Sequence, residues 1–216
     1  MKVNLRKIVT LAMMAAVAFV VVWIGRLPIA PVPFLKYDPK DIIIVIDGFL
    51  FGPLSAALIS LVVSLVEMVT ISDTGVIGLI MNVLGTCSFA CVASAVYKYR
   101  PNLKNAVTGL LCGLATMTVV MLLWNYFITP LYMGVSRQDI AGMLLPIFLP
   151  FNLIKGGLNT AGALLLYKPV VGALRKAKLV PPSQQEKGKR NLGIILVALV
   201  LLATCVLAAL VFGGVL

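Results

Sequence analysis

The residues of this sequence that could do chemistry are a few polar side chains set inside long apolar runs. Asn152 and Lys155 stand three positions apart, so on a helix they share one face. Asn82 and Asn125 lie in two other apolar runs, and Glu67 stands near the end of a further one. An ionisable group inside a membrane segment is costly unless it is paired or hydrated, so these positions predict a binding site.

Each of these residues also has a purely structural interpretation. The stem of Lys155 could lift its ammonium group to the membrane interface. Asn82 and Asn125 could hydrogen-bond between helices without touching a ligand. The common face of Asn152 and Lys155 favours a shared partner over this interpretation.

The groups available are suited to binding and not to catalysis. The chain has no His, which excludes His-containing catalytic triads, imidazole metal sites and histidine proton relays. Its cysteines lie in apolar runs and are interpreted as packing residues: Cys87, Cys91, Cys112 and Cys205. Several aromatic residues are placed to join the amides and the lysine: Tyr37, Trp124, Tyr126 and Phe127. This set fits a planar small molecule with many hydrogen-bonding groups, and it indicates neither a metal site nor a cofactor.

The elements that position these residues are membrane helices. The chain has 216 residues, of which 61% are hydrophobic and only 12% charged, with mean hydropathy +1.09. Such a composition excludes a soluble or disordered protein, and the net charge of +11 indicates membrane orientation more than nucleic-acid binding. The uncharged runs are 8–25, 48–66, 74–97, 105–136, 140–154 with 156–167, and 191–216.

Two of these segments need interpretation. The run 8–25 follows a basic tail like that of a secretory signal, but its length and the absence of a good cleavage site predict a retained first helix. Residues 41–70 are too few for two full spans, and Gly48 and Gly52-Pro53 interrupt them. We expect a short, partly buried hairpin there, which is tolerated at membrane depth only beside protein or a water-filled cavity.

The distribution of cations predicts the orientation. If 41–70 crosses twice and the N-terminus is cytoplasmic, thirteen cations lie inside, and Arg26, Lys36, Lys40 and Arg137 lie outside. A single crossing with an external N-terminus gives the same count, but the basic N-terminal tail favours the cytoplasmic side. Loops 26–40, 71–75 and 128–142 are then external. Asn152 and Lys155 fall in the first turns of the sixth helix, after Pro146 and Pro150, and the polar residues gather in the outer leaflet.

Three motifs resemble a known family. They are Phe-Leu-Lys-Tyr-Asp-Pro-Lys-Asp at 34–41, Gly-Phe-Leu-Phe-Gly-Pro at 48–53, and Pro-Phe-Asn-Leu-Ile-Lys-Gly at 150–156. Together they resemble the RibU family, the riboflavin-specific S components of energy-coupling factor (ECF) vitamin transporters, over roughly residues 5–178.

The resemblance implies a fold and a function. It implies an all-α membrane protein, a six-helix S-component bundle that captures riboflavin from outside beneath a lid formed by the first loop, without being an enzyme. The residues that match the binding positions are Leu35, Tyr37, Asn125, Asn152 and Lys155, and Asn82 is added from its place in the outer leaflet. Ala12 and Ala16 match the ridge that docks on the transmembrane coupling subunit, although ordinary packing within the chain would also explain them.

The resemblance also implies partners and a location. The partners are riboflavin as the transported ligand, the coupling subunit, two cytoplasmic ATPase subunits and membrane lipid, with no nucleic acid. Since the chain has no phosphate-binding Gly-x-x-x-x-Gly-Lys-Ser/Thr motif, ATP hydrolysis falls to the partners. The predicted location is the bacterial cell membrane, with several crossings and a cytoplasmic N-terminus.

The chain departs from the family pattern at its C-terminal end. We expect a substrate-binding domain over 1–178, a basic cytoplasmic linker over 179–190 and an extra transmembrane helix over 191–216. Three alternatives stay open at this point: an S component for another vitamin, a membrane scaffold without a ligand, and an intramembrane enzyme that would depend on Asp47.

Overall fold

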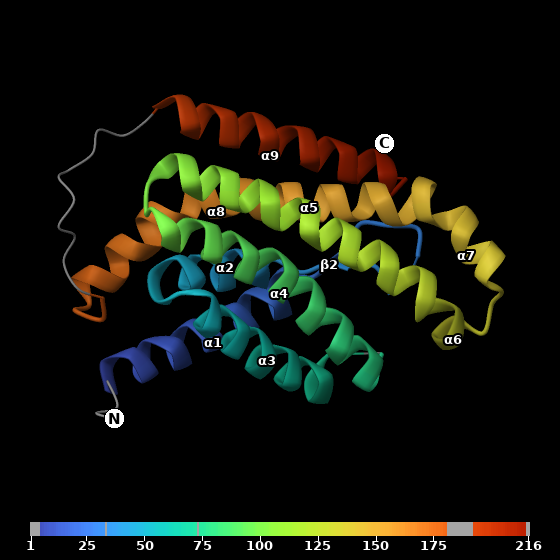
Figure 1. The fold of residues 1–216 in the computed structure, drawn as a ribbon, viewed down its shortest axis with the longest axis horizontal. Coiled ribbons are helices and arrows are strands. Elements are labelled where there is room, and N and C mark those ends of the chain that lie inside the picture. Colours follow the sequence, from blue (N-terminus) through green and yellow to red (C-terminus); the bar gives the residue numbers. More distant parts are fainter. Residues whose placement is uncertain (1–4, 33, 73, 181–191, 215–216) are drawn as a thin grey trace.

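The long apolar runs form helices, because a chain in lipid must satisfy its own backbone hydrogen bonds. The computed structural model describes residues 5–32, 34–72, 74–180 and 192–214. Within these residues six helical segments are long and apolar enough to cross a membrane (Figure 1). They are α1 (Leu5–Gly25), α3 (Pro53–Thr70), α4 (Gly75–Tyr99), α5 (Leu103–Phe127), the continuous run Arg137–Lys176 and α9 (Leu192–Phe212).

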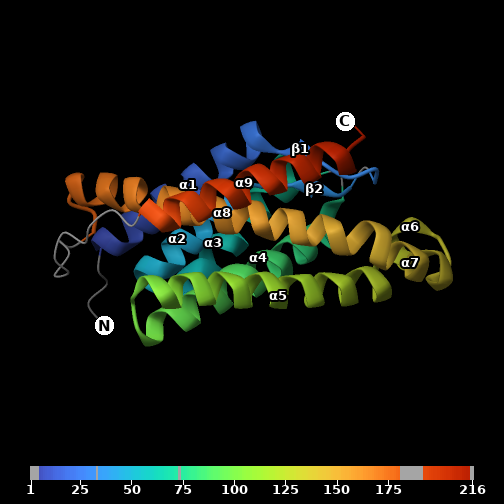
Figure 2. The same cartoon turned by 90° about the horizontal axis from the view of Figure 1, so that it is seen from above.

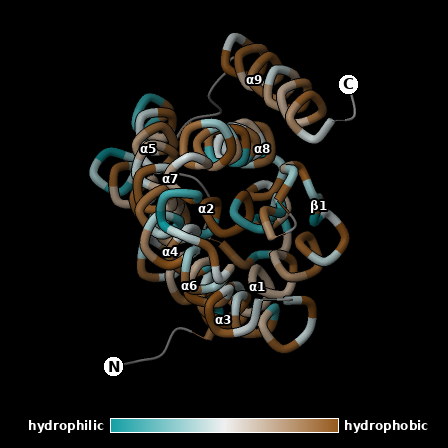
Figure 3. The backbone as a smooth tube through the Cα atoms, turned by 90° about the vertical axis from the view of Figure 1, so that its right-hand side faces the viewer, coloured by the Kyte–Doolittle hydropathy of each residue, from teal (hydrophilic) through white to brown (hydrophobic). Residues whose placement is uncertain are grey.

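The predicted short hairpin is confirmed. Helix α2 (Lys40–Phe51) has only 12 residues and is separated from α3 by Gly52, whose φ of 96° suits glycine. Pro53 then begins α3, where its missing N–H costs nothing. Every residue of α2 from Lys40 to Gly48 is buried, and the helix lies in the middle of the bundle (Figure 3). The surrounding helices therefore shield a segment too short to span the membrane.

The sixth long segment begins earlier than the prolines predict. A capping box formed by Ser136 and Asp139 begins α7 (Arg137–Met143), and a π-helical turn, η1 (Leu144–Phe148), joins it to α8 (Leu149–Lys176). Pro146 lies inside this turn and does not mark a helix start as predicted, whereas Pro150 lies in the first turn of α8, as predicted. A proline leaves a gap in the ladder of backbone hydrogen bonds, and a local π turn is one way to accommodate it.

Two short features cover one end of the bundle. Strands β1 (Leu27–Pro28) and β2 (Lys36–Tyr37) pair antiparallel within the first loop, with Leu27 opposite Tyr37. At the same end α5 stops at Phe127 and α6 (Thr129–Met133) follows, so the apolar run 105–136 is broken near Pro130. We call residues 26–32 and 34–39, which carry the two strands, the lid segment.

The helices α4 and α5 pack closely, and so do α8 and α9. A Cβ added at Gly109 or Gly113 of α5 would lie 2.6 or 2.4 Å from a backbone carbonyl oxygen of α4, so the two helices approach at these glycines. The predicted extra helix is confirmed as α9, which packs along α8 (Figures 1 and 2). Residues 181–190 of the predicted linker lie outside the described residues.

Candidate ligand-binding site

The lid segment is held on the bundle by buried ion pairs. Asp38 is 2% exposed, and one carboxylate oxygen lies 3.0 Å from Nε of Arg26. Nζ of Lys155, on α8, lies 3.6 Å from the other oxygen of Asp38. The Lys155 ammonium also lies 3.8 Å from Asp41 at the start of α2. Its side chain is 14% exposed and is directed to these carboxylates, which excludes the interpretation that it reaches out to the membrane interface.

Asp41 connects three helices. Its two carboxylate oxygens accept hydrogen bonds from Thr86 of α4 at 2.7 Å and from Asn159 of α8 at 3.1 Å. A buried carboxylate is stable only when it is paired and hydrogen-bonded, and these donors together with Lys155 meet that need. Asp41 therefore fixes the position of the lysine relative to α2 and α4.

A second buried pair lies beside the first. Lys40 forms an ion pair with Glu67 of α3, and both side chains are 1% exposed. Asn82 of α4 donates its amide to the second oxygen of Glu67 at 3.2 Å. These ion pairs join three cations to three carboxylates at the lid end of the bundle: Arg26, Lys40 and Lys155 with Asp38, Asp41 and Glu67. Their formal charges cancel, which makes their burial tolerable.

The cations keep the lid carboxylate ionised. Burial by itself raises the pKa of Asp38, but the neighbouring charges of Lys155, Lys40 and Arg26 outweigh it and hold that pKa below its ordinary value. For Tyr37 the causes act in the other direction: burial first, and then the charges of Asp41 and Asp38, raise the pKa of its phenol. The lid segment therefore presents a charged Asp38 and a neutral Tyr37 at physiological pH.

A small cavity lies under the lid segment and beside Lys155. Its volume is about 30 Å³, which is room for one or two water molecules. The lining residues come from the lid segment and from α4, α5 and α8: Arg26, Phe34, Leu35, Lys36, Asp38, Met81, Asn82, Gly85, Met117, Met121, Asn125, Phe151, Asn152 and Lys155. We call it the inner cavity. Its wall combines amides and charges with methionine and phenylalanine side chains.

A larger pocket adjoins the inner cavity on the outside. It has a volume of about 400 Å³, within the range of small-molecule sites. Five residues line both spaces, namely Arg26, Phe34, Lys36, Met81 and Asn82, and Thr74, Tyr132 and Met133 complete the outer one. We call it the outer pocket. Because three of the shared residues belong to the lid segment, moving that segment would join the two spaces.

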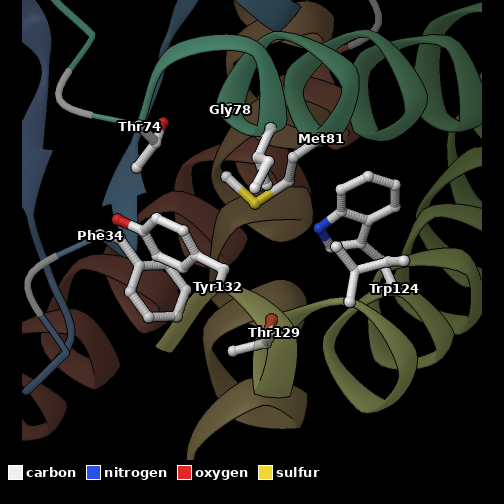
Figure 4. Close-up of a pocket in the computed structure, with 9 residues that line it drawn as sticks. Phe34, Thr74, Gly78, Met81, Trp124, Thr129 and Tyr132 are labelled. Atoms are coloured by element: carbon white, nitrogen blue, oxygen red, sulfur yellow. The ribbon is translucent and has the colours of Figure 1, made fainter. Parts of the chain in front are cut away.

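Aromatic side chains enclose an apolar recess at the edge of these spaces. Figure 4 shows the rings of Phe34 and Tyr132 next to each other, with Trp124 on the other side of Met81. The first two rings meet edge to face, with centroids 5.8 Å apart. This recess offers flat apolar surfaces close to the hydrogen-bonding groups of the inner cavity.

The structure brings most of the predicted site residues together. Five of them line the inner cavity: Leu35, Asn82, Asn125, Asn152 and Lys155. Asn125 donates to the carbonyl of Met121 at 2.7 Å and accepts from Thr129 at 2.9 Å. Asn152 donates to the carbonyl of Phe148 at 2.7 Å. Both amides are thus oriented by their own helices.

Other predicted residues lie elsewhere. Tyr37 is absent from the lining of the inner cavity and is buried in a cluster with Ile29 and Cys205. Of the aromatic residues on α5, Trp124 lines the recess, whereas Tyr126 and Phe127 pack against each other. Neither of these two lines the inner cavity, the outer pocket or the recess. Their positions differ because a helix turns by about 100° per residue, so neighbours in sequence face different directions.

Two further predictions concern residues outside the cavity. Ala12 and Ala16 of α1 are exposed on the surface of the bundle, so packing within the chain does not explain them. Asp47, the one residue on which a catalytic interpretation depended, is fully buried in α2 and lines neither the inner cavity nor the outer pocket.

The charge network is what sequence reasoning missed. Arg26 and Lys40 were assigned to membrane orientation, but both are held in ion pairs with buried carboxylates. Asp41 and Asn159 were not assigned to the site. One signal was present: the carboxylates Asp38, Asp41 and Glu67 fall at the same end of the apolar segments as these cations, and buried charges must be paired.

Known proteins with the same sequence pattern and fold are transporter components. Residues 6–167 match the family described as ECF transporter, substrate-specific component. The chain is 33% identical to the riboflavin transporter RibU of Staphylococcus aureus (strain TCH60), over 79% of this chain and 93% of that one. It is 30% identical to the riboflavin transporter RibU of Streptococcus thermophilus (strain ATCC BAA-250 / LMG 18311), over 80% of this chain and 86% of that one.

The fold is similar as well. A solved structure, described as the S component of a bacterial ECF transporter, superposes with a TM-score of 0.67 at 30% sequence identity. The match covers 78% of this chain and 97% of that structure.

Proposed function

This chain belongs to the substrate-specific components of ECF transporters, and from that premise we propose that it captures riboflavin at the lid end of the bundle for uptake. The observation that carries the proposal is the inner cavity, where Asn152 and Lys155 stand on one wall beneath Leu35 of the lid segment. Two relatives that are at least 30% identical over most of their length are named riboflavin transporters, which supports the choice of ligand.

The chemistry of riboflavin suits these groups. Its tricyclic ring is flat and largely apolar, but one edge carries carbonyl oxygens and an imide N–H. The amides of Asn125 and Asn152 can both donate and accept, and the Lys155 ammonium can donate to a carbonyl oxygen. The side chains of Met81, Met117 and Phe151 provide apolar walls for the ring faces. The ribityl chain carries hydroxyl groups, which fit the polar side chains Arg26, Lys36 and Thr74 of the outer pocket.

Binding requires the lid segment to move. The inner cavity of about 30 Å³ is too small for a flavin, whereas the outer pocket of about 400 Å³ has the size of small-molecule sites. Displacing Phe34 and Lys36 would join the two spaces, and returning them would cover the ligand. The ligand is thus taken up from the side where the lid segment lies.

The chain works with partner subunits that drive transport. Membership of the family implies ECF partner subunits, and we assign the docking surface to the exposed Ala12 and Ala16 on α1. Small side chains at this spacing let a second helix approach closely. In this assignment the coupling subunit docks on α1, two cytoplasmic ATPase subunits supply energy, and this chain holds riboflavin without changing it.

The proposed orientation places the lid segment outside the bacterial cell. The N-terminal end of α1 and the lid segment lie at opposite ends of the bundle (Figure 1). Arg6 and Lys7 lie at the N-terminal end of α1, and the turn from α4 to α5 at the same end carries Lys98, Arg100 and Lys104 on or beside it. Basic residues concentrate on the cytoplasmic side of membrane proteins, which favours a cytoplasmic N-terminus.

A competition experiment tests the ligand. Purified protein in lipid nanodiscs is loaded with tritiated riboflavin and challenged with excess unlabelled riboflavin, thiamine, biotin or folate. We expect displacement by riboflavin and none by the other vitamins. Displacement by another vitamin, with no retention of riboflavin, would show that the pocket belongs to an S component of different specificity. Failure to retain any vitamin would favour a scaffold without a ligand.

A further inference from the structure

Helix α9 lies beyond the part of the chain that matches the family and packs closely on the helix that carries Lys155. The family match ends at residue 167, and α9 begins at Leu192. A Cβ added at Gly157 of α8 would lie 2.5 Å from Sγ of Cys205 on α9. Such a separation is too short for two nonbonded heavy atoms, so Gly157 is what lets α9 approach at this level. Cys205 is 8% exposed.

The C-terminal half of α9 also reaches the lid segment. Ile29, Val32 and Tyr37 of the lid segment share one buried cluster with Cys205, and Ala208, Ala209 and Phe212 of α9 pack against it. A Cβ added at Gly213 would lie 3.9 Å from the carbonyl oxygen of Ile29, which places the end of α9 against the lid backbone. In Figures 1 and 2 the C-terminal end of α9 lies beside the strands of the lid segment.

The position of α9 leaves the docking surface free. Seen along the bundle, α9 lies on the side opposite α1 and α3 (Figure 3). Its outer face is apolar and exposed, with Val197, Val200 and Val211 more than half exposed, as expected for contact with lipid. The helix therefore contacts α8 and the lid segment without covering Ala12 and Ala16.

We propose that α9 is a clamp on the lid segment, which holds it over the inner cavity and slows the release of the bound ligand. The proposal rests on the proposed function, since it assumes that the lid segment covers the ligand. To open, the lid segment must separate Ile29, Val32 and Tyr37 from α9, which exposes apolar surface that is buried in the closed arrangement. No side chain of α9 lines the inner cavity or the outer pocket, so the residues of α9 are positioning residues.

The clamp explains the burial of Tyr37. This residue does not line the inner cavity, although its neighbours Leu35 and Lys36 do. In a strand, successive side chains point to opposite faces, so Tyr37 points away from the side on which Lys36 lines the cavity. Its partners on that side include Cys205. The lid segment is thus held between the cavity on one face and α9 on the other.

The test compares two adjacent residues at the end of α9. Phe212 packs on the lid cluster, whereas Val211 is 63% exposed and faces away. We expect Phe212→Ala to raise the dissociation rate of tritiated riboflavin about tenfold, measured by chase with unlabelled ligand in nanodiscs. Val211→Ala is the control and should stay within about twofold of wild type. An unchanged dissociation rate in Phe212→Ala would overturn the proposal.

A second set of variants tests whether a change in riboflavin dissociation depends on the position of α9. Gly157→Ala should push Cys205 away and speed dissociation, and the double variant Gly157→Ala/Cys205→Ala should recover the wild-type rate because the second change removes the clashing sulfur. Gly172→Ala, on the same helix with open space around it, is the control. If the double variant releases riboflavin as fast as Gly157→Ala, the effect does not involve α9 and the proposal is wrong.

A measurement without ligand separates this proposal from the proposed function. Hydrogen exchange of the backbone amides of residues 34–37 reports opening of the lid segment directly. We expect faster exchange in Phe212→Ala than in Val211→Ala. Equal exchange would reject the clamp even if riboflavin binds. If wild-type protein binds no riboflavin and the exchange still differs, the clamp stands and the proposed ligand is wrong.

Discussion

The charges at the lid end of the bundle act together. Arg26, Lys155 and Asp38 connect the lid segment to α8, and Asp41 holds Lys155 from α2. Since each charge is paired, the site can contain a buried ammonium group without a large desolvation cost. A ligand that offers carbonyl oxygens to Lys155 exchanges one set of polar contacts for another. This exchange favours selection by hydrogen-bonding pattern over attraction of a charged ligand.

Replacing Lys155 tests the contact with the ligand. We expect Lys155→Met to weaken riboflavin binding roughly 10- to 100-fold, because a charge-assisted hydrogen bond is worth about 1.5–3 kcal/mol. Lys155→Arg keeps the charge and should lose less. The control Lys168→Met changes an exposed lysine further along α8. Equilibrium dialysis in nanodiscs measures all three, and equal affinity in Lys155→Met would remove this residue from the site.

The pH dependence tests whether Asp38 stays ionised. Its pKa is lowered in the folded protein, so the stabilisation from its ion pairs is complete above the ordinary value of 3.8 and is lost as pH falls through the lowered pKa. We therefore expect the contribution of Asp38 to riboflavin affinity to be constant between about pH 5 and 8. A transition centred within that range that is present in the wild type and absent from Asp38→Asn would show that Asp38 gains a proton there. Asp38→Asn should lower affinity across the whole range.

For single residues, the sequence predicts the asparagines and the lysine of the site but not the residues that pair with the buried charges. Asn152 and Lys155 are recognisable because polar residues at helical spacing interrupt an apolar run. The pairing of Arg26 with Asp38 and of Lys40 with Glu67 depends on contacts between separate elements, which spacing does not reveal. The direction of Tyr37, away from the inner cavity and into a buried cluster, likewise depends on the strand that contains it.

The short helix α2 and the closely packed pair α4 and α5 position the residues of the site. α2 occupies the centre of the bundle and brings Lys40 and Asp41 to the lid end, where α3, α4 and α8 provide partners. α4 and α5 provide Asn82 and Asn125, and their spacing is fixed at Gly109 and Gly113. The width of the inner cavity therefore depends on how closely α4 and α5 approach.

Substituting Gly113 tests this close approach. A Cβ there would lie 2.4 Å from the carbonyl oxygen of Phe89, and a backbone atom cannot turn away. We expect Gly113→Ala to destabilise the protein by about 1–3 kcal/mol, seen as a lower melting temperature in a thiol-reactive fluorescence assay. Gly172→Ala should be neutral, because no atom lies within 4 Å of the added carbon. A neutral Gly113→Ala would mean that α4 and α5 are free to shift apart.

The ends of a helix can be predicted from the sequence where neighbouring residues determine them. The break at Gly52-Pro53 and the extra C-terminal helix were predicted correctly, because a glycine-proline interruption and a long apolar run are local signals. The start of the sixth long segment was placed too late, because Pro146 was interpreted as a helix start. The capping box at Ser136 was the better signal, and the π turn depends on the packing of the whole segment.

On the scale of the whole molecule, binding and docking surfaces are separate. The lid segment and the inner cavity lie at one end, α9 lies on one side, and the exposed Ala12 and Ala16 lie on α1 at the opposite side (Figures 1 and 3). This separation lets a partner bind while the ligand stays covered. It also means that changes at one surface should leave the other intact.

Bulky residues on α1 test the assignment of the docking surface. We expect Ala12→Trp and Ala16→Trp to prevent copurification with the coupling and ATPase subunits while riboflavin affinity stays within about twofold, because a large side chain keeps a neighbouring helix at a distance. Val197→Trp, on the exposed face of α9, is the control and should copurify normally. Normal copurification of both alanine variants would place the docking surface elsewhere.

The most direct measurement is a fluorescence titration of riboflavin with the purified chain in nanodiscs. We expect saturable quenching with one riboflavin bound per chain, because an enclosed site places the flavin ring against aromatic and methionine side chains such as Phe34, Met81 and Phe151. Lys155→Met should need at least tenfold more protein for the same quenching. Riboflavin fluorescence that stays unquenched at saturating wild-type protein would contradict the central claim.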